Sequence, residues 1–208
     1  TQPDSGEIWF DGERLKDEHT RSVGYMPEER GLYKKMKVVE QIVYLLSLRG
    51  MVEKKAKTVA EEWLEKLGLS DWAKRKTMDL SKGMQQKVQF ISTVAHQPRL
   101  LILDEPFSGL DPVNTQIMEQ EIRRMRKEGT TIIFSTLRME QVEELCDYIA
   151  LMNNGKLMLE DEIQTVRRQF QKNLYELEFQ GDGATLEEIE GITIDSLNGQ
   201  RAMLVLGE

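Results

Sequence analysis

The run LLILDEP at residues 100–106, followed by SGLD at residues 108–111, decides the fold of this 208-residue chain. Four consecutive apolar residues indicate a strand that is buried on both faces, and two carboxylates, Asp104 and Glu105, follow it directly. Strands of this kind belong to α/β sheets, where ligands bind at the carboxyl ends of the strands. The sequence therefore predicts an α/β fold with an acidic pair at the ligand-binding edge of its sheet.

Strand and helix patterns alternate along the rest of the chain, which supports the α/β assignment. The composition changes beyond about Glu162, where two further strand patterns, 174–179 and 202–206, predict a separate small α+β element. We therefore expect one domain over residues 1–160 and an accessory segment over residues 161–208. The predicted strands of the first part are 6–10, followed by a tight turn at Asp11-Gly12, then 22–25, and a buried β-branched strand at 130–134. A hairpin is predicted at 149–152 and 156–159, with its turn at Asn154-Gly155. The predicted helices are 38–48, 54–67, one from residue 82 towards His96, 114–127 and 139–146.

The acidic pair suits phosphate chemistry. A carboxylate at the end of a buried strand can hold Mg²⁺ beside a nucleotide, which predicts the metal role for Asp104. The next carboxylate, Glu105, points differently and can polarise an attacking water as a general base. Alone, such a pair could equally cap a helix or lie in a surface turn. Pro106 and the SGLD turn after it favour the phosphate site.

Residues 81–85 open a helix and form a candidate anion site. Backbone N–H groups and the helix dipole attract a phosphate there, and a small residue such as Gly83 allows its close approach. An ordinary capped helix is the alternative, and the position of this segment just before the acidic strand argues against that alternative.

Together, LSKGMQQ at residues 80–86, LLILDEP and SGLD resemble the signature, Walker B and D-loop segments of ABC-type ATPases. Residues 24–38 resemble the ATP-binding subunits of NatA-like sodium exporters and related multidrug exporters. The resemblance implies a P-loop NTPase fold, ATP and Mg²⁺ as cofactors, and a dimer in which the signature helix caps the γ-phosphate held by the opposite subunit. The implied nucleotide-binding residues are Ser81, Lys82, Gly83, Met84, Gln85 and Asp111, with Lys82 in place of the usual glycine.

Two switch positions depart from the family pattern. Glu28 replaces a glutamine, and its carboxylate keeps an oxygen for Mg²⁺. Leu137 replaces the switch histidine, and we expect it neither to bind the γ-phosphate nor to hold Glu105 in place. This predicts weak hydrolysis with nucleotide capture less affected. The alternative is a sequence variant in an ordinary enzyme.

The P-loop motif Gly-x-x-x-x-Gly-Lys-Ser/Thr, whose amides and lysine cradle the phosphates, does not occur in this sequence. In the family it precedes the segment that resembles residues 2–6. We therefore expect an N-terminally truncated nucleotide-binding domain that lacks the P-loop strand and helix. The chain alone is expected to bind ATP poorly and to be inactive.

The net charge of −8 gives no footprint for nucleic acid, and no apolar run approaches the roughly 18 residues of a membrane span. The resemblance implies a cytoplasmic subunit at the inner face of the membrane, bound to a permease through residues 40–79, and paired with a second copy or another ATPase subunit. One alternative is a hydrolysis-impaired scaffold or regulator. Another, a soluble ABC protein of translation or DNA repair, is disfavoured by the acidic charge and the short length.

Overall fold

The computed structural model describes residues 3–29, 31–170, 174–180, 192–198 and 200–206. The chain forms two compact units, Thr1–Gln141 and Val142–Glu208. The functional boundary expected at residue 161 remains a prediction.

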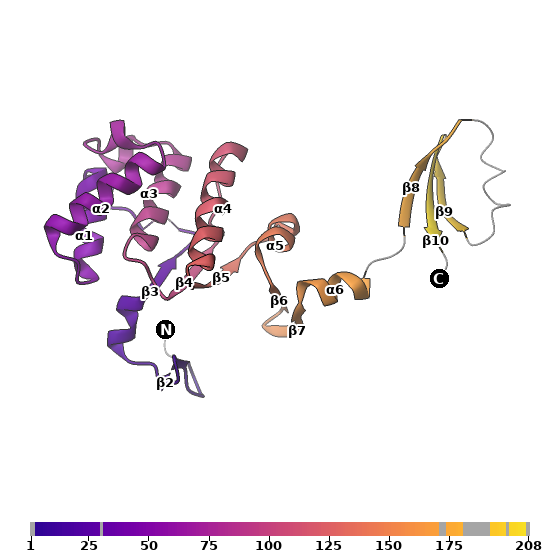
Figure 1. Cartoon of the computed structure of the whole chain (residues 1–208), viewed down its shortest axis with the longest axis horizontal. Coiled ribbons are helices and arrows are strands. Elements are labelled where there is room, and N and C mark those ends of the chain that lie inside the picture. Colours follow the sequence, from indigo (N-terminus) through magenta and orange to yellow (C-terminus); the bar gives the residue numbers. More distant parts are fainter. Residues whose placement is uncertain (1–2, 30, 171–173, 181–191, 199, 207–208) are drawn as a thin grey trace. The chain divides into compact units, whose positions relative to one another are not determined.

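The first unit is built on a parallel sheet of three strands in the order β3-β4-β5 (Figure 1). These are β3 (Val23–Met26), β4 (Leu100–Asp104) and β5 (Thr131–Ser135). The central strand, β4, is the apolar run from which the α/β fold was predicted, and its Leu101 and Leu103 are buried. The prediction of an α/β sheet with Asp104 at a strand end is confirmed.

The prediction that β5 is buried is wrong. Thr131, Ile133 and Ser135 are exposed, and the Ile133 side chain is 56% exposed. In the part of the chain that the structure describes, β5 pairs only with β4, so it is an edge strand there. β-Branched residues favour the extended backbone of an edge strand as much as that of a central one, so they do not report burial.

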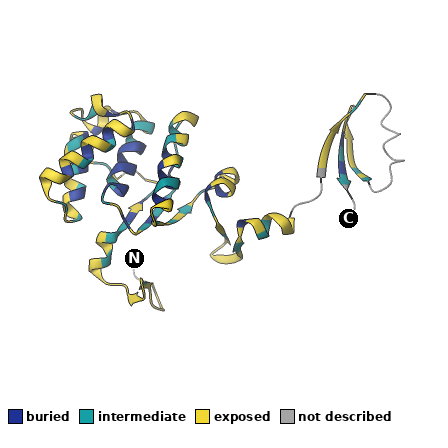
Figure 2. Ribbon diagram, in the orientation of Figure 1, coloured by how far each residue is buried: buried dark blue, intermediate teal, exposed yellow. Residues whose placement is uncertain are grey.

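Four helices pack in this unit: α1 (Val38–Leu48), α2 (Glu53–Lys66), α3 (Lys82–Val94) and α4 (Pro112–Lys127). The short 3-10 helices are η1 (Asp17–Ser22), η2 (Ser70–Trp72) and η3 (Thr77–Asp79). Helix α3 is the most buried, as its dark blue ribbon shows (Figure 2). The four predicted helices are confirmed. Helix α4 begins two residues earlier than predicted, because Asp111 caps it and Pro112 suits the first helical position.

Strand β3 lies against α3 at Gly24. A Cβ on this residue would lie 2.7 Å from the Thr93 backbone oxygen and 3.0 Å from Leu101 Cδ1. Only glycine allows this approach, which fixes where the residues after β3 emerge beside β4.

A short hairpin precedes the sheet. Strands β1 (Trp9–Phe10) and β2 (Glu13–Arg14) pair across Asp11 and Gly12, which both have positive φ. After β5, helix α5 covers Met139–Leu145. The turn at Asp11 and Gly12 and the helix after β5 were both predicted.

In the second unit, β6 (Tyr148–Asn153) and β7 (Lys156–Glu162) form the predicted hairpin, whose turn residues Asn154 and Gly155 have positive φ. Helix α6 (Ile163–Phe170) follows. A second sheet has the order β8-β10-β9, formed by β8 (Leu174–Glu178), β9 (Ile192–Asn198) and β10 (Arg201–Leu206). Strand β9 was not predicted, although its alternating Ile192 and Ile194 are the signal for it.

Every helix in the described residues is too short or too polar to span a bilayer.

Candidate functional site

Asp104 is the last residue of β4 and lies opposite Ser135 of β5. The Ser135 hydroxyl donates a hydrogen bond of 2.5 Å to Asp104 Oδ1. One carboxylate oxygen is thus fixed by the neighbouring strand, and the side chain is half-buried at the carboxyl edge of the sheet. The hydrogen bond to Oδ1 therefore fixes the orientation of the Asp104 carboxylate at the edge of the sheet.

Glu105 follows in the left-handed region, with φ of 44°. Its backbone N–H donates to the Ser135 carbonyl at 3.0 Å. Its carboxylate is held by the segment that leaves β5: the Leu137 backbone N–H donates to Oε1 at 2.7 Å, and the Thr136 hydroxyl lies 3.4 Å from Oε2. The carboxylate is therefore positioned by the residues that follow the neighbouring strand.

The expectation that residue 137 cannot hold Glu105 is wrong. The Leu137 side chain is 94% exposed and supplies no polar group, as expected. The bond to Glu105 comes from the backbone N–H, which every residue except proline provides. Replacement of histidine by leucine at this position leaves that contact intact.

Thr136 is a site residue that the sequence pattern alone did not indicate. Its hydroxyl has one proton and lies near two acceptors, Glu105 Oε2 and the buried Gln141 Oε1, the latter at 3.1 Å. It also accepts from the Arg138 backbone N–H at 3.2 Å. The signal for it was its place directly after a strand that ends beside the acidic pair.

The start of α3 is capped by Ser81, whose hydroxyl accepts from the Met84 N–H at 3.3 Å. Ser81 and Lys82 are exposed. Gly83 lies against the turn after β4, because a Cβ there would be 3.1 Å from the Gly109 carbonyl oxygen. This glycine therefore has a packing role within the chain, and its predicted role in admitting a phosphate stays a prediction.

Two adjacent glutamines on α3 tie it to different segments. Gln85 Nε2 donates to the carbonyls of Thr77 and Leu80, both at 3.2 Å. The fully buried Gln86 donates to the Pro106 carbonyl at 2.9 Å and lies 3.4 Å from that of Glu105. Gln86 was not predicted as a site residue, because its hydrogen-bond partners are distant in the sequence. The amide of Gln85, which was predicted to bind nucleotide, holds the segment before α3 in this structure.

Asp111 caps α4. Its Oδ1 accepts from the Asn114 backbone N–H at 3.0 Å, and its Oδ2 from Asn114 Nδ2 at 2.5 Å. The bonds from Asn114 hold the pKa of Asp111 below its usual value. The carboxylate therefore stays ionised and fixed at the turn beside Gly83.

Glu28 is exposed, two residues beyond the end of β3. Because β3 and β4 are parallel, it emerges at the same edge as Asp104. Among the described residues, no three or more His, Cys, Asp or Glu side chains form a metal cluster. Mg²⁺ often binds through only one or two carboxylates plus water and substrate phosphates, so the donor set of Asp104 and Glu28 fits that mode.

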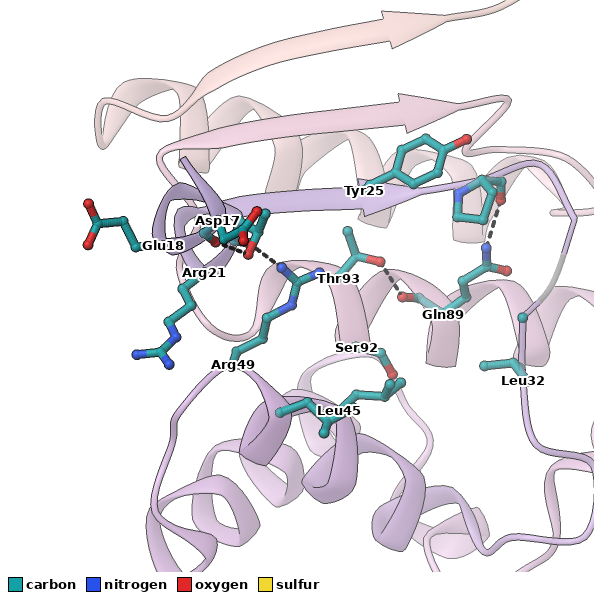
Figure 3. Close-up of a pocket in the computed structure, with 14 residues that line it drawn as sticks. Asp17, Glu18, Arg21, Tyr25, Leu32, Leu45, Arg49, Gln89, Ser92 and Thr93 are labelled. Carbon is teal, nitrogen blue, oxygen red and sulfur yellow. Dashed lines mark hydrogen bonds between the residues drawn. The ribbon is translucent and has the colours of Figure 1, made fainter. Parts of the chain in front are cut away.

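A separate pocket of about 790 Å³ lies between β3, α1, α3 and η1. Figure 3 shows Tyr25 from β3, Gln89 and Thr93 from α3, Leu45 from α1 and Arg49, which follows α1, around it. Gln89 Nε2 donates to the Pro27 carbonyl at 2.7 Å, and Arg49 donates to the Val23 carbonyl at 3.0 Å. The pocket therefore adjoins the segment that carries Glu28 but does not include the acidic pair.

Comparisons with known proteins identify the family. Residues 1–108 match the ABC transporter family. The chain is 41% identical to an uncharacterized ABC transporter ATP-binding protein of Alkalihalophilus pseudofirmus, over 92% of this chain and 72% of that protein. It is 34% identical to the lantibiotic transport ATP-binding protein SrtF of Streptococcus pyogenes, over 76% of this chain and 67% of SrtF. Across four curated relatives, the chain spans 56% to 72% of their length.

The resemblance to NatA is also confirmed, since the ABC transporter ATP-binding protein NatA of Bacillus subtilis is 30% identical over 79% of this chain and 69% of NatA. A solved structure of the ATP-binding subunit of an ABC transporter superposes with a TM-score of 0.74 at 28% identity, over 81% of this chain and 72% of that chain. The order of signature helix, acidic strand and capped turn agrees with these relationships, and the chain belongs to the ATP-binding proteins of the ABC transporter family.

Proposed function

We propose that the whole protein is the ATP-hydrolysing subunit that powers an ABC exporter, for ions or drugs, through nucleotide-driven dimerisation. The observation that carries the proposal is the Glu105 carboxylate, which the Leu137 N–H and the Thr136 hydroxyl hold beside Asp104. The similarity to SrtF, a lantibiotic transport protein by name, supports export. Because the chain spans only part of its relatives, the activity is assigned to the whole protein.

Each carboxylate has a distinct role in this proposal. Bound Mg²⁺ would neutralise phosphate charge as the γ-phosphoryl group is transferred to water. Asp104 and Glu28 would hold the metal ion, and Asp104 Oδ2 would be available to it because Ser135 holds Oδ1. Glu105 accepts the proton of the attacking water, and its bonds to residues 136 and 137 keep the carboxylate in one orientation.

The start of α3 acts on the nucleotide of the opposite subunit. The exposed Ser81 and Lys82 lie at the positive end of the helix dipole, where N–H groups and a lysine attract a phosphate. Gly83, Met84 and Gln85 complete this signature segment, and Asp111 communicates across the interface. We infer a homodimer or a pair with a related ATPase subunit.

The permease binds on the side of α1. Tyr44, Leu48 and Val52 are exposed there, and Leu48 also lines the pocket of Figure 3. The pocket that Leu48 lines also has charged lining residues, Asp17, Glu18, Arg21 and Arg49, and exposed apolar residues beside charged ones suit a protein partner. This contact would place the subunit on the cytoplasmic face of the membrane.

Replacement of the general base tests the proposal. In membranes containing the whole protein and its permease, Glu105→Gln should lower ATP turnover by about 100-fold or more, because it removes the proton acceptor. ATP-dependent dimerisation should survive. Glu160→Gln, which alters an exposed carboxylate on β7, is the matched control. Undiminished turnover in the Glu105 variant would falsify the assignment.

The second candidate is a hydrolysis-impaired, nucleotide-dependent scaffold. The exposed and apolar Leu137 side chain favours it, because that side chain offers no hydrogen bond to a γ-phosphate. Leu137→His in the whole protein should then raise turnover about 10-fold or more. Turnover that is already high and insensitive to this change excludes the scaffold.

A further inference from the structure

We propose that Lys87 is a positioning residue that couples the C-terminal end of α2 to the Asp111 carboxylate through Asn114. The coupling is a property of the chain itself. Its consequence for ATP hydrolysis, which is that a displacement of α2 on the permease side reaches the dimer interface, rests on the proposed function.

Lys87 lies on α3 and is only 7% exposed. Its ammonium group donates to the Leu67 carbonyl at the end of α2 at 2.7 Å and to Asn114 Oδ1 on α4 at 2.9 Å. Burial lowers the pKa of Lys87, and the charge of Asp111 counteracts that effect. A buried ammonium needs such partners, so α3 cannot shift relative to α2 or α4 without a loss of hydrogen bonds.

Asn114 transmits the constraint to Asp111. Lysine only donates, so the Asn114 side-chain oxygen must face Lys87, which turns its NH₂ group towards Asp111 Oδ2. The Asn114 backbone N–H binds the other oxygen, Oδ1. The Asp111 carboxylate only accepts, so it selects the same orientation of the amide as Lys87 does. Lys87 therefore holds the Asn114 side chain in place from its oxygen end, and loss of Lys87 leaves the amide attached to Asp111 alone.

A second contact makes α2 and α4 move together. Lys66, in the last turn of α2, forms an ion pair of 2.6 Å with Glu121 of α4. Glu121 is buried and is also held by Arg124 Nε at 3.0 Å. The end of α2 is thus attached to α4 at two places, one of them in the first turn, which Asp111 caps. Movement of α2 is therefore passed to Asp111 rather than absorbed between the helices.

Amide hydrogen exchange at Asn114 measures the coupling between Lys87 and Asp111, because the Asn114 backbone N–H donates a hydrogen bond to Asp111. In the 208-residue chain, Lys87→Met should speed exchange at residue 114 about 10-fold, the effect of losing one charge-assisted hydrogen bond. Lys87→Arg should restore most of the protection. Lys127→Met, which changes an exposed lysine of α4, is the control. Unchanged exchange in Lys87→Met overturns the proposal.

Should Lys87→Met fail to fold, Asn114→Ala provides the same test, because residue 114 is only half-buried. The backbone N–H remains and should exchange faster without the amide that orients Asp111. Wild-type protection of that N–H in Asn114→Ala overturns the proposal as well.

Transmission from α2 has its own test. Gly68 follows α2 with φ of 69°, and a Cβ there meets no atom within 4 Å, so Gly68→Ala strains only the end of the helix. Exchange at Asn114 should change at least about 3-fold in Gly68→Ala and should respond less in the Lys87→Met background, where the Lys66–Glu121 ion pair still joins α2 to α4. If the exchange rate of the Asn114 amide is the same in Gly68→Ala as in the wild type, the end of α2 is not coupled to Asp111.

In the whole protein, Lys87→Met should lower kcat while KM for ATP changes less than about 2-fold, and Lys87→Arg should recover kcat. The exchange experiments need neither nucleotide nor partner. If the wild-type whole protein had no ATPase activity, the proposed function would be wrong. The exchange experiments would still decide whether Lys87 positions Asn114 and Asp111.

Discussion

Gly24→Ala should strongly destabilise the first unit. The added Cβ would lie 2.7 Å from the Thr93 carbonyl oxygen and 3.0 Å from Leu101 Cδ1. The first neighbour is backbone of α3 and cannot rotate away, so β3 and α3 must separate by several tenths of an ångström. Overpacking of this kind costs about 1–3 kcal/mol, and a backbone clash places the change near the upper end, at about 2–3 kcal/mol.

Urea denaturation followed by tryptophan fluorescence measures this cost, since Trp63 of α2 packs edge-on against Phe90 of α3 with ring centroids 6.2 Å apart. Gly31→Ala is the matched control, because a Cβ at residue 31 has no neighbour within 4 Å. The control should change the free energy of unfolding by less than about 0.5 kcal/mol. A loss below about 0.5 kcal/mol in Gly24→Ala would refute the argument that this glycine is required for packing.

Three further predictions concern the site, the pH response and the nucleotide. Thr136→Val should lower kcat of the whole protein about 3- to 10-fold, since one hydrogen bond to the Glu105 carboxylate is lost, and Thr136→Ser should not; equal losses in both variants contradict a role for the hydroxyl. Burial, with the charge of Arg49, lowers the pKa of His96 from 6.5 to about 4. The free energy of unfolding is therefore highest above pH 6.5 and falls as the pH drops towards 4, because the unfolded chain binds the proton first. After allowance for partial exposure, the free energy of unfolding should fall by about 1–2 kcal/mol over this range. If His96→Gln leaves the pH dependence of unfolding unchanged, His96 is not the cause of it. Titrated with a fluorescent ATP analogue, the 208-residue chain should bind more weakly than micromolar, because it has no Gly-x-x-x-x-Gly-Lys-Ser/Thr run, and micromolar binding would disprove this.

Local patterns predicted the elements well because their signals are local. Apolar spacing over residues 38–48 gave the bounds of α1 as the structure has them, and Asn154-Gly155 marked the turn between β6 and β7. The acidic strand indicated the edge of the sheet at which the candidate site lies, because its carboxylates stand directly after four apolar residues.

Contacts between distant segments could not be read in this way. The bond from Leu137 to Glu105 is made by the backbone, so the side chain at that position carries no signal for it. Gln86 and Lys87 appear as polar residues on a helix, and only the fold reveals that their partners lie about 20 residues or more away. The exposure of β5 likewise depends on its neighbours in the sheet and not on its own sequence.

Three successive residues of α3, Gln85, Gln86 and Lys87, each donate to a different part of the chain. Successive side chains of a helix point about 100° apart, so these three directions are set by the helical repeat alone. Deletion of one residue between Ser81 and Gln85 would turn all three donors away from their partners at once. The start of α3 should therefore accept changes of residue type in evolution or in a mutational library far more readily than any change of length.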